Sequence, residues 1–264
     1  MSAFRSRLHG AQLAPVFQFC LQESPDEARV LAIQWLKQRR RSRRRWDALA
    51  GADPQTTLRQ AQSIRIHDLL TLGLFLNRFC ERGLVLATIH MGDYLHATLA
   101  LLQQCAPRPI LIVRQKNAGD IEAKAFGQLA ALGFDFDVVR TGEKTAGLRI
   151  LKGLKKGAVV VMLYDLPASF GETTPVKIFD QTLHWVSGPV QAASLARALI
   201  VPYVCFEMDD GFCCDLLPIH DMQQEKSRTA VTQALVTAAE KYIRRFPDQW
   251  LQWNQIPHMG SASE

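Results

Sequence analysis

The sequence predicts an α/β protein with a mainly parallel central sheet flanked by helices, an antiparallel edge hairpin and an N-terminal helical segment. After Gly83, short apolar runs of strand length alternate with helix-length segments, as in βαβ units. Those runs are apolar throughout, which is typical of parallel strands covered on both faces. Before Gly83, apolar residues recur at helical spacing. We therefore expect a helical segment over residues 1–82, packed on an α/β core over residues 83–264 in one compact domain.

The N-terminal segment contains three expected helices. Ser24 is a candidate N-cap, Pro25 falls at the first helical position, and Glu27 stands three residues after the cap, so a helix begins here. This helix continues into a run of arginines. Pro54 opens a second helix, and the spacing of apolar residues predicts a third over residues 64–80.

In the core we expect five strands, at residues 84–89, 109–113, 136–139, 158–163 and 200–206. The intervening helices are expected at residues 94–104, 121–132, 145–155 and 190–198. Near the C-terminus, residues 202–208 and 212–219 flank Asp209-Asp210-Gly211, which predicts a hairpin.

Composition excludes several classes of protein. With 48% hydrophobic and 21% charged residues, the chain as a whole is not disordered, collagen-like or a coiled coil. We expect neither a transmembrane helix nor a secretory signal, because the apolar runs are only long enough for a core. The 6 cysteines form no Cys-x-x-Cys pair, so we expect free, buried thiols in a reducing cytoplasm rather than a zinc ribbon.

Polar side chains follow the expected strands where each one ends. His90, Arg114, Arg140 and Asp165 each lie at or just after the carboxyl end of a strand, where ligands of open parallel sheets bind. A histidine beside arginines suits proton transfer on an anionic substrate, whose phosphate or carboxylate the arginines neutralise. The alternative is that these residues are polar only because the strands leave the core there.

The most informative segment is His90-Met91-Gly92-Asp93-Tyr94 after the first core strand. Further along the chain come Arg114 with Asn117, a Gly-strand-Asp block ending at Asp165, and the block Phe246-Pro247-Asp248-Gln249-Trp250-Leu251-Gln252-Trp253. In this order, over about residues 30–257, these motifs resemble the bacterial lipid A late acyltransferases, a branch of the lysophospholipid acyltransferase superfamily.

The resemblance implies a divergent soluble acyltransferase of lipid biosynthesis. It would move an acyl chain from a thioester donor, an acyl-carrier protein (ACP) or acyl-CoA, to a hydroxyl or amine, with no metal or redox cofactor. His90 would be the general base. The expected substrate-binding residues are Arg114, Lys116, Asn117, Arg140 and Asp165.

One position departs from the family pattern. The family carries an acid five residues after its histidine, where this chain has Leu95. Asp93 is the candidate replacement that would orient His90 as a second catalytic residue; it is equally an N-cap for the helix that starts at Tyr94. His96 is expected on the helix surface, and a metal site of His90, Asp93 and His96 has no further ligand cluster to support it. Without the family acid, an acyl-thioesterase or a non-catalytic acyl-binding relative is the alternative function.

The net charge of +6 comes largely from six arginines between Arg39 and Arg45. Such a run suits an anionic membrane surface or an acidic carrier protein, although a solvated helix face is an alternative. Nucleic acid is disfavoured because only Trp35 and Trp46 flank the run, and no aromatic residue interleaves it. We expect a cytoplasmic protein, peripheral at the inner membrane if the arginines bind lipid.

Overall fold

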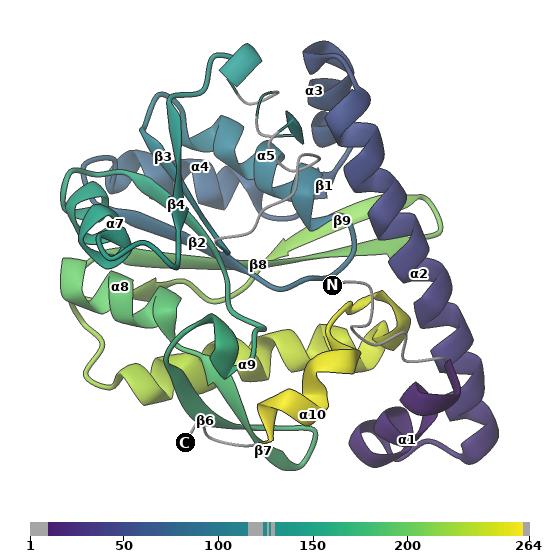
Figure 1. Ribbon diagram of the computed structural model, residues 1–264. Coiled ribbons are helices and arrows are strands. Elements are labelled where there is room, and N and C mark those ends of the chain that lie inside the picture. Colours follow the sequence, from purple (N-terminus) through teal and green to yellow (C-terminus); the bar gives the residue numbers. More distant parts are fainter. Residues whose placement is uncertain (1–9, 116–123, 126, 128–129, 261–264) are drawn as a thin grey trace.

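The computed structural model describes residues 10–115, 124, 125, 127 and 130–260 (Figure 1). It confirms the predicted fold class: a mainly parallel sheet in the order β1-β9-β8-β2-β5-β3-β4, with the short strand β10 also paired to β8. The bounds are β1 Arg65–Ile66, β2 Leu84–Thr88, β3 Ile110–Arg114, β4 Phe136–Arg140, β5 Val159–Leu163, β8 Leu199–Met208, β9 Gly211–Leu216 and β10 His220–Asp221.

The five expected strands are present and run parallel, from β8 through β2, β5 and β3 to β4. Strand β2 lies in the middle and is buried along its whole length, as its unbroken apolar sequence predicted. The expected hairpin is also confirmed, because β8 and β9 pair antiparallel around the turn at Asp209 and Asp210. Consequently the carboxyl ends of β2, β5, β3 and β4 lie side by side, at the same end of the sheet.

Two cores cover the two faces of the sheet. On one face, Leu84 and Leu86 of β2 pack with α3 Pro54–Gln62, α4 Leu69–Arg78 and α5 Tyr94–Cys105. On the other face, Val85 and Ala87 pack with the helices α7 Ala146–Lys155, α8 Gly188–Ala196 and α9 Arg228–Arg245. Successive residues of a strand point to opposite faces, so a single apolar strand supplies both cores.

The N-terminal segment contains α1 Gly10–Leu21 and the long α2 Pro25–Gly51, which runs along one side of the sheet (Figure 1). The predicted start of α2 is confirmed, since Ser24 and Glu27 form a complete capping box. Trp35 fixes α2 to the C-terminal part of the chain, because its buried indole N–H donates to the Trp250 carbonyl at 2.7 Å.

The helix expected over residues 64–80 begins later than predicted. Arg65 and Ile66 instead form β1, which pairs in parallel with β9 and is the edge strand on that side of the sheet. Arg65 also makes an ion pair with Asp210. Helix α4 starts only at Leu69, after Asp68 takes a left-handed backbone conformation. Pairing with a distant strand overrides the helical spacing, which is a local signal.

Several further elements were not predicted. Strands β6 Thr173–Ile178 and β7 Gln181–Val186 form a separate antiparallel hairpin. Its turn residues Phe179 and Asp180 both have positive φ, without the Asn-Gly or Asp-Gly pair that usually marks such a turn. The C-terminal part adds α10 Ile256–Met259 and the short 3₁₀ turns Pro247–Gln249 and Trp253–Gln255, and another 3₁₀ turn spans Ala168–Phe170.

Half of the helix expected over residues 121–132 falls outside the described residues. Within the part of the chain that the structure covers, no helix is long and apolar enough to cross a bilayer.

Candidate functional site

The carboxyl ends of the parallel strands bring two of the predicted residues into contact. His90 stands two residues after β2, and Asp165 stands two residues after β5. These strands are neighbours, with Thr88 paired to Leu163, so the two side chains emerge beside each other. Sequence analysis expected both residues on one rim but did not expect them to pair.

Asp165 holds His90 through both the ring and the backbone. The Asp165 Oδ1 lies 2.8 Å from His90 Nδ1, and Oδ2 accepts the His90 backbone N–H at 2.7 Å. The indole N–H of Trp250 donates to the same Oδ2 at 2.8 Å. Asp165 is fully buried, whereas the His90 side chain is 18% exposed. A carboxylate accepts here, so in the neutral form of the ring Nδ1 carries the hydrogen and Nε2 carries the lone pair.

Residues around this pair complete its environment. The Gln252 side-chain nitrogen lies 2.9 Å from His90 Nδ1; it is a neighbour and not a donor there, because Nδ1 already carries the hydrogen that Asp165 accepts. The Tyr94 ring packs edge-on against the imidazole. Burial raises the pKa of the neighbouring Tyr164, and the negative charge of Asp165 acts in the same direction, so that phenol stays protonated.

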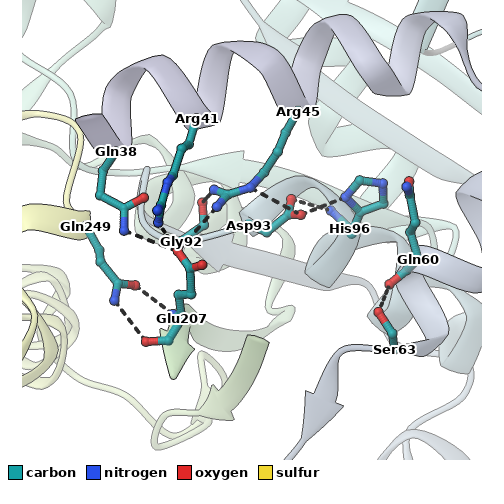
Figure 2. A network of polar contacts seen from close by, with 10 residues as sticks. All are labelled: Gln38, Arg41, Arg45, Gln60, Ser63, Gly92, Asp93, His96, Glu207 and Gln249. Carbon is teal, nitrogen blue, oxygen red and sulfur yellow. Dashed lines mark hydrogen bonds and ion pairs between the residues drawn. The ribbon is translucent and has the colours of Figure 1, made fainter. Parts of the chain in front are cut away.

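Asp93, the expected partner of His90, contacts a different histidine. Its Oδ2 lies 2.9 Å from His96 Nδ1, and its Oδ1 accepts the His96 backbone N–H at 3.4 Å, which makes Asp93 the N-cap of α5. Figure 2 shows this pair beneath α2, with Arg45 approaching the same carboxylate, at 3.9 Å from Nε to Oδ2. The predicted cap is confirmed, and the carboxylate is directed along α5 toward His96.

The expectation for His96 was wrong. It was placed on the helix surface, but its side chain is only 6% exposed. The reason is tertiary: α3 packs on this face of α5, and Thr57 and Ala61 of α3 are buried.

A cavity of about 620 Å³ opens beside His90. Its wall is mostly apolar and comes from α2, α5, β3, β5, α7 and the segment before β6; Leu49, Leu99, Leu102, Ile112, Ile150 and Phe170 are among its lining residues. A volume of this size suits a ligand with a substantial apolar part. His90 and Arg114 both line the cavity, which therefore joins a titratable ring to a cationic group.

The remaining predicted substrate residues have different positions. Arg114 ends β3, lines the cavity and lies over the Trp46 ring at 5.3 Å. Arg140 is its register partner at the end of β4 and is exposed. Asp165 lies under His90. Lys116 and Asn117 fall outside the described residues.

Sequence reasoning missed three contributors to the site: Trp250 as a donor to Asp165, Gln252 and Trp46. Trp250 and Trp253 were expected in the core, and both are fully buried. Their position after a Pro-Asp-Gln turn was visible in the sequence, but nothing local showed that this segment returns to β2.

The arginine run on α2 is divided between two environments. Arg45 turns inward and binds Glu207 and the Gly92 carbonyl, and Arg41 lies 3.7 Å from Glu207 (Figure 2). Arg40, Arg43 and Arg44 are exposed. These three residues, named the exposed arginine face below, project outward from the helix whose next turns, at Trp46 and Leu49, line the cavity.

Two further observations concern the described part of the chain. There, no group of three histidine, cysteine or acidic side chains could hold a metal ion. Cys80 is exposed, whereas the other five cysteines are buried and free, as expected.

Comparison with models of protein families gives a match. The family model described as "Bacterial lipid A biosynthesis acyltransferase" matches residues 71–255, which include the ends of β2, β3, β4 and β5. No curated protein matches the chain.

Proposed function

Because the chain belongs to the bacterial lipid A biosynthesis acyltransferase family, we propose that it transfers an acyl chain from a thioester donor to a hydroxyl or amine acceptor, with His90 as the general base. The observation that carries this proposal is the His90–Asp165 pair at the wall of a large, mostly apolar cavity. Family membership supports acyl transfer in general, and the pair supports the identity of the base.

The geometry suggests the order of proton transfers. His90 Nδ1–H donates to Asp165, so Nε2 takes the proton of the acceptor O–H or N–H as that atom attacks the thioester carbonyl carbon. The new C–O or C–N bond forms, the C–S bond breaks, and the imidazolium returns the proton to the leaving thiolate. Asp165 stabilises the imidazolium and keeps the ring in the reactive tautomer, which makes it a positioning residue.

The donor's two parts match two parts of the cavity. Its hydrocarbon chain suits the leucine and isoleucine wall, while Arg114 in the cavity lining suits the phosphates of a pantetheine arm or of CoA. Arg140, which is outside the lining and is the register partner of Arg114 on β4, could bind the same phosphates from the rim. We propose the exposed arginine face as the docking surface for an acidic acyl-carrier protein, because it continues into the helix turns that line the cavity.

The test of the reaction uses lauroyl and palmitoyl thioesters of CoA and of acyl-carrier protein. Free thiol release is followed with and without a lipid A precursor or a lysophospholipid as acceptor. We expect acceptor-dependent release that falls at least about a hundredfold in His90→Ala, the usual range for loss of a general base. The matched control is His258→Ala, since His258 is an exposed histidine on α10.

Each other outcome has a defined meaning. Release at the same rate without acceptor identifies an acyl-thioesterase, and binding without release identifies an acyl-binding relative. Wild-type activity in His90→Ala would refute the assignment of the base.

Docking is tested separately, by titrating acyl-carrier protein and vesicles of anionic or neutral lipid with wild type and with Arg40→Ala/Arg43→Ala/Arg44→Ala. We expect salt-sensitive carrier binding that the triple variant loses. Loss of vesicle binding alone would assign the exposed arginine face to the membrane instead.

A further inference from the structure

The cavity beside His90 extends over both faces of the sheet. Its lining residues Leu102 and Ile112 belong to the core that packs against α3, α4 and α5. Its lining residues Ile150 and Met162 belong to the core on the other face, which packs against α7, α8 and α9. The cavity therefore has two sides, which are called the α5 side and the α8 side below.

His90 lies where the two sides meet. Its ring packs against Tyr94 of α5, with the ring centroids 5.3 Å apart. The Gln252 side-chain nitrogen lies 2.9 Å from His90 Nδ1, and the next residue, Trp253, is packed in the core of the α8 side. A donor on one side and an acceptor on the other would therefore both reach the proposed base.

The α5 side offers a ligand few hydrogen bonds from its threonines and from His96. The hydroxyls of Thr88 and Thr98 already make hydrogen bonds with Tyr203. Thr57 Oγ1 and His96 Nε2 have no partner among the described residues, but both atoms are buried from solvent. This side therefore suits the hydrocarbon chain of the donor.

The α8 side has polar side chains that no described residue uses. Gln191 of α8 and Gln255 line the cavity and are half-buried, and Glu172 lines it at an exposed position. None of these three side chains makes a hydrogen bond or an ion pair with a described residue. The Glu172 backbone carbonyl accepts from the Ser187 N–H at 2.9 Å and from its hydroxyl at 3.1 Å, so the backbone is fixed without the carboxylate.

The formal charges of the cavity differ between the two sides. Among the lining residues that the structure describes, and apart from the histidines, only Arg114 and Glu172 are charged at neutral pH. Arg114 lies over the ring of Trp46, whose indole N–H donates to the Tyr94 hydroxyl, so this cation is on the α5 side. A lone carboxylate on the α8 side attracts a cation and repels a phosphate.

We propose that the α8 side binds the acceptor and that Glu172 selects an acceptor that carries an ammonium group, an inference that rests on the proposed function. The side-chain amides of Gln191 and Gln255 both donate and accept, which suits the hydroxyl groups of a small polar molecule. The acceptor class is therefore an amino alcohol. Its ammonium group is bound as a charge, while a neighbouring hydroxyl or neutral amine of the same molecule attacks the thioester.

The expected selectivity is moderate, because Glu172 is exposed and water screens its charge. We expect an ammonium-bearing acceptor to bind about threefold to tenfold more tightly than an uncharged one of the same size. A phosphorylated acceptor should bind most weakly of the three.

The test measures dissociation constants by calorimetry, so it does not depend on turnover. The probes share one octyl chain and are an amino diol, an uncharged diol and the phosphate monoester of that diol. They are titrated into wild type, Glu172→Gln and Glu172→Lys. The matched control is Glu81→Gln, because Glu81 is an exposed glutamate outside the cavity lining. Since Glu172→Gln keeps the backbone bonds to Ser187, its thermal melt should match that of wild type.

We expect wild type and Glu81→Gln to prefer the amino diol, Glu172→Gln to bind the amino diol and the uncharged diol equally, and Glu172→Lys to prefer the phosphate monoester. The proposal is overturned if wild type does not prefer the amino diol, or if that preference survives in both Glu172 variants. A preference without acyl transfer to any probe would refute only the proposed function. Acyl transfer with equal kcat/KM for all the probes would refute only this inference.

Discussion

Replacing Asp165 by Asn tests the assignment of the positioning acid. The Asn carbonyl oxygen can still accept the His90 backbone N–H and the Trp250 indole N–H, which now reach Asp165 Oδ2 at 2.7 and 2.8 Å. Its NH₂ group then faces His90 Nδ1, where the carboxylate stood at 2.8 Å. A donor at this position favours the tautomer with the hydrogen on Nε2, and that tautomer cannot take a proton from the acceptor.

The magnitude follows from the loss of the reactive tautomer. The same exchange in a Ser-His-Asp triad lowers kcat about 10⁴-fold, which is about 5.5 kcal/mol at 1.36 kcal/mol for each factor of ten. We expect a loss of about 10³–10⁴-fold in the kcat for thioester consumption, with a smaller change in KM. Because two of the three hydrogen bonds survive, the urea midpoint should change little. Stopped-flow thiol detection and a urea titration measure the two quantities.

The matched control is Asp215→Asn. Asp215 also contacts a histidine ring, that of His67, and it accepts from Tyr242, but it lies on β9 outside the cavity lining. Full activity in Asp165→Asn would refute the reasoning. If Asp93→Asn instead abolished the chemical step while Asp165→Asn did not, the acid predicted from the sequence would be the true partner of His90.

Three further predictions concern stability and reactivity. Gly92→Ala should destabilise the protein by about 2–5 kcal/mol in urea unfolding, because Gly92 has φ +58° and a Cβ there would lie 2.5 Å from a carbonyl oxygen of β8; an unchanged midpoint would contradict this. A chromogenic disulfide at a pH of about 8 should react quickly with the thiol of Cys80 only, because Cys80 is exposed and the other cysteines are buried. Burial raises the pKa of the Cys105 thiol, for example, to about 11. Fast labelling of Cys80→Ser would be inconsistent with that burial. Hydrogen bonds from Arg82 lower the pKa of Asp221 in the folded protein, so the stability they contribute is present above the unfolded pKa of about 3.9 and is lost as the pH falls through the lower folded value. Arg82→Met should therefore be less stable than wild type at neutral pH, and the two stabilities should converge in acid. A difference in stability that does not change with pH would refute the linkage.

The sequence was sufficient for the features that depend on local pattern. Apolar runs predicted the parallel strands, and Ser24 with Glu27 predicted the start of α2. The failures came from long-range contacts. Ile66 formed the edge strand β1 rather than part of a helix, and His96 was buried by another helix. The spacing of residues in the sequence does not predict that α3 packs on α5, because that contact depends on tertiary structure.

The same distinction explains the site. Residues at strand ends were predicted to share a rim, since parallel topology brings those ends together. Which acid faces His90 could not be predicted, because Asp93 is three residues away in sequence and Asp165 is distant. The order β2-β5 in the sheet makes Asp165 the neighbour, while the cap of α5 directs Asp93 to His96.

These contacts give a physical account of the apolar residue at position 95. Leu95 lies on α5 and lines the cavity, at the position where the family resemblance expected an acid. A carboxylate there would put a charge, with its hydration cost, in a wall that suits hydrocarbon. The carboxylate of Asp165, at the end of β5, instead contacts His90 Nδ1 from a buried position. There the Trp250 indole N–H and the His90 backbone N–H donate to it and compensate for the loss of hydrogen bonds to water. The acid at the end of β5 therefore supports the imidazole without adding charge to the cavity wall, and this arrangement allows position 95 to be apolar.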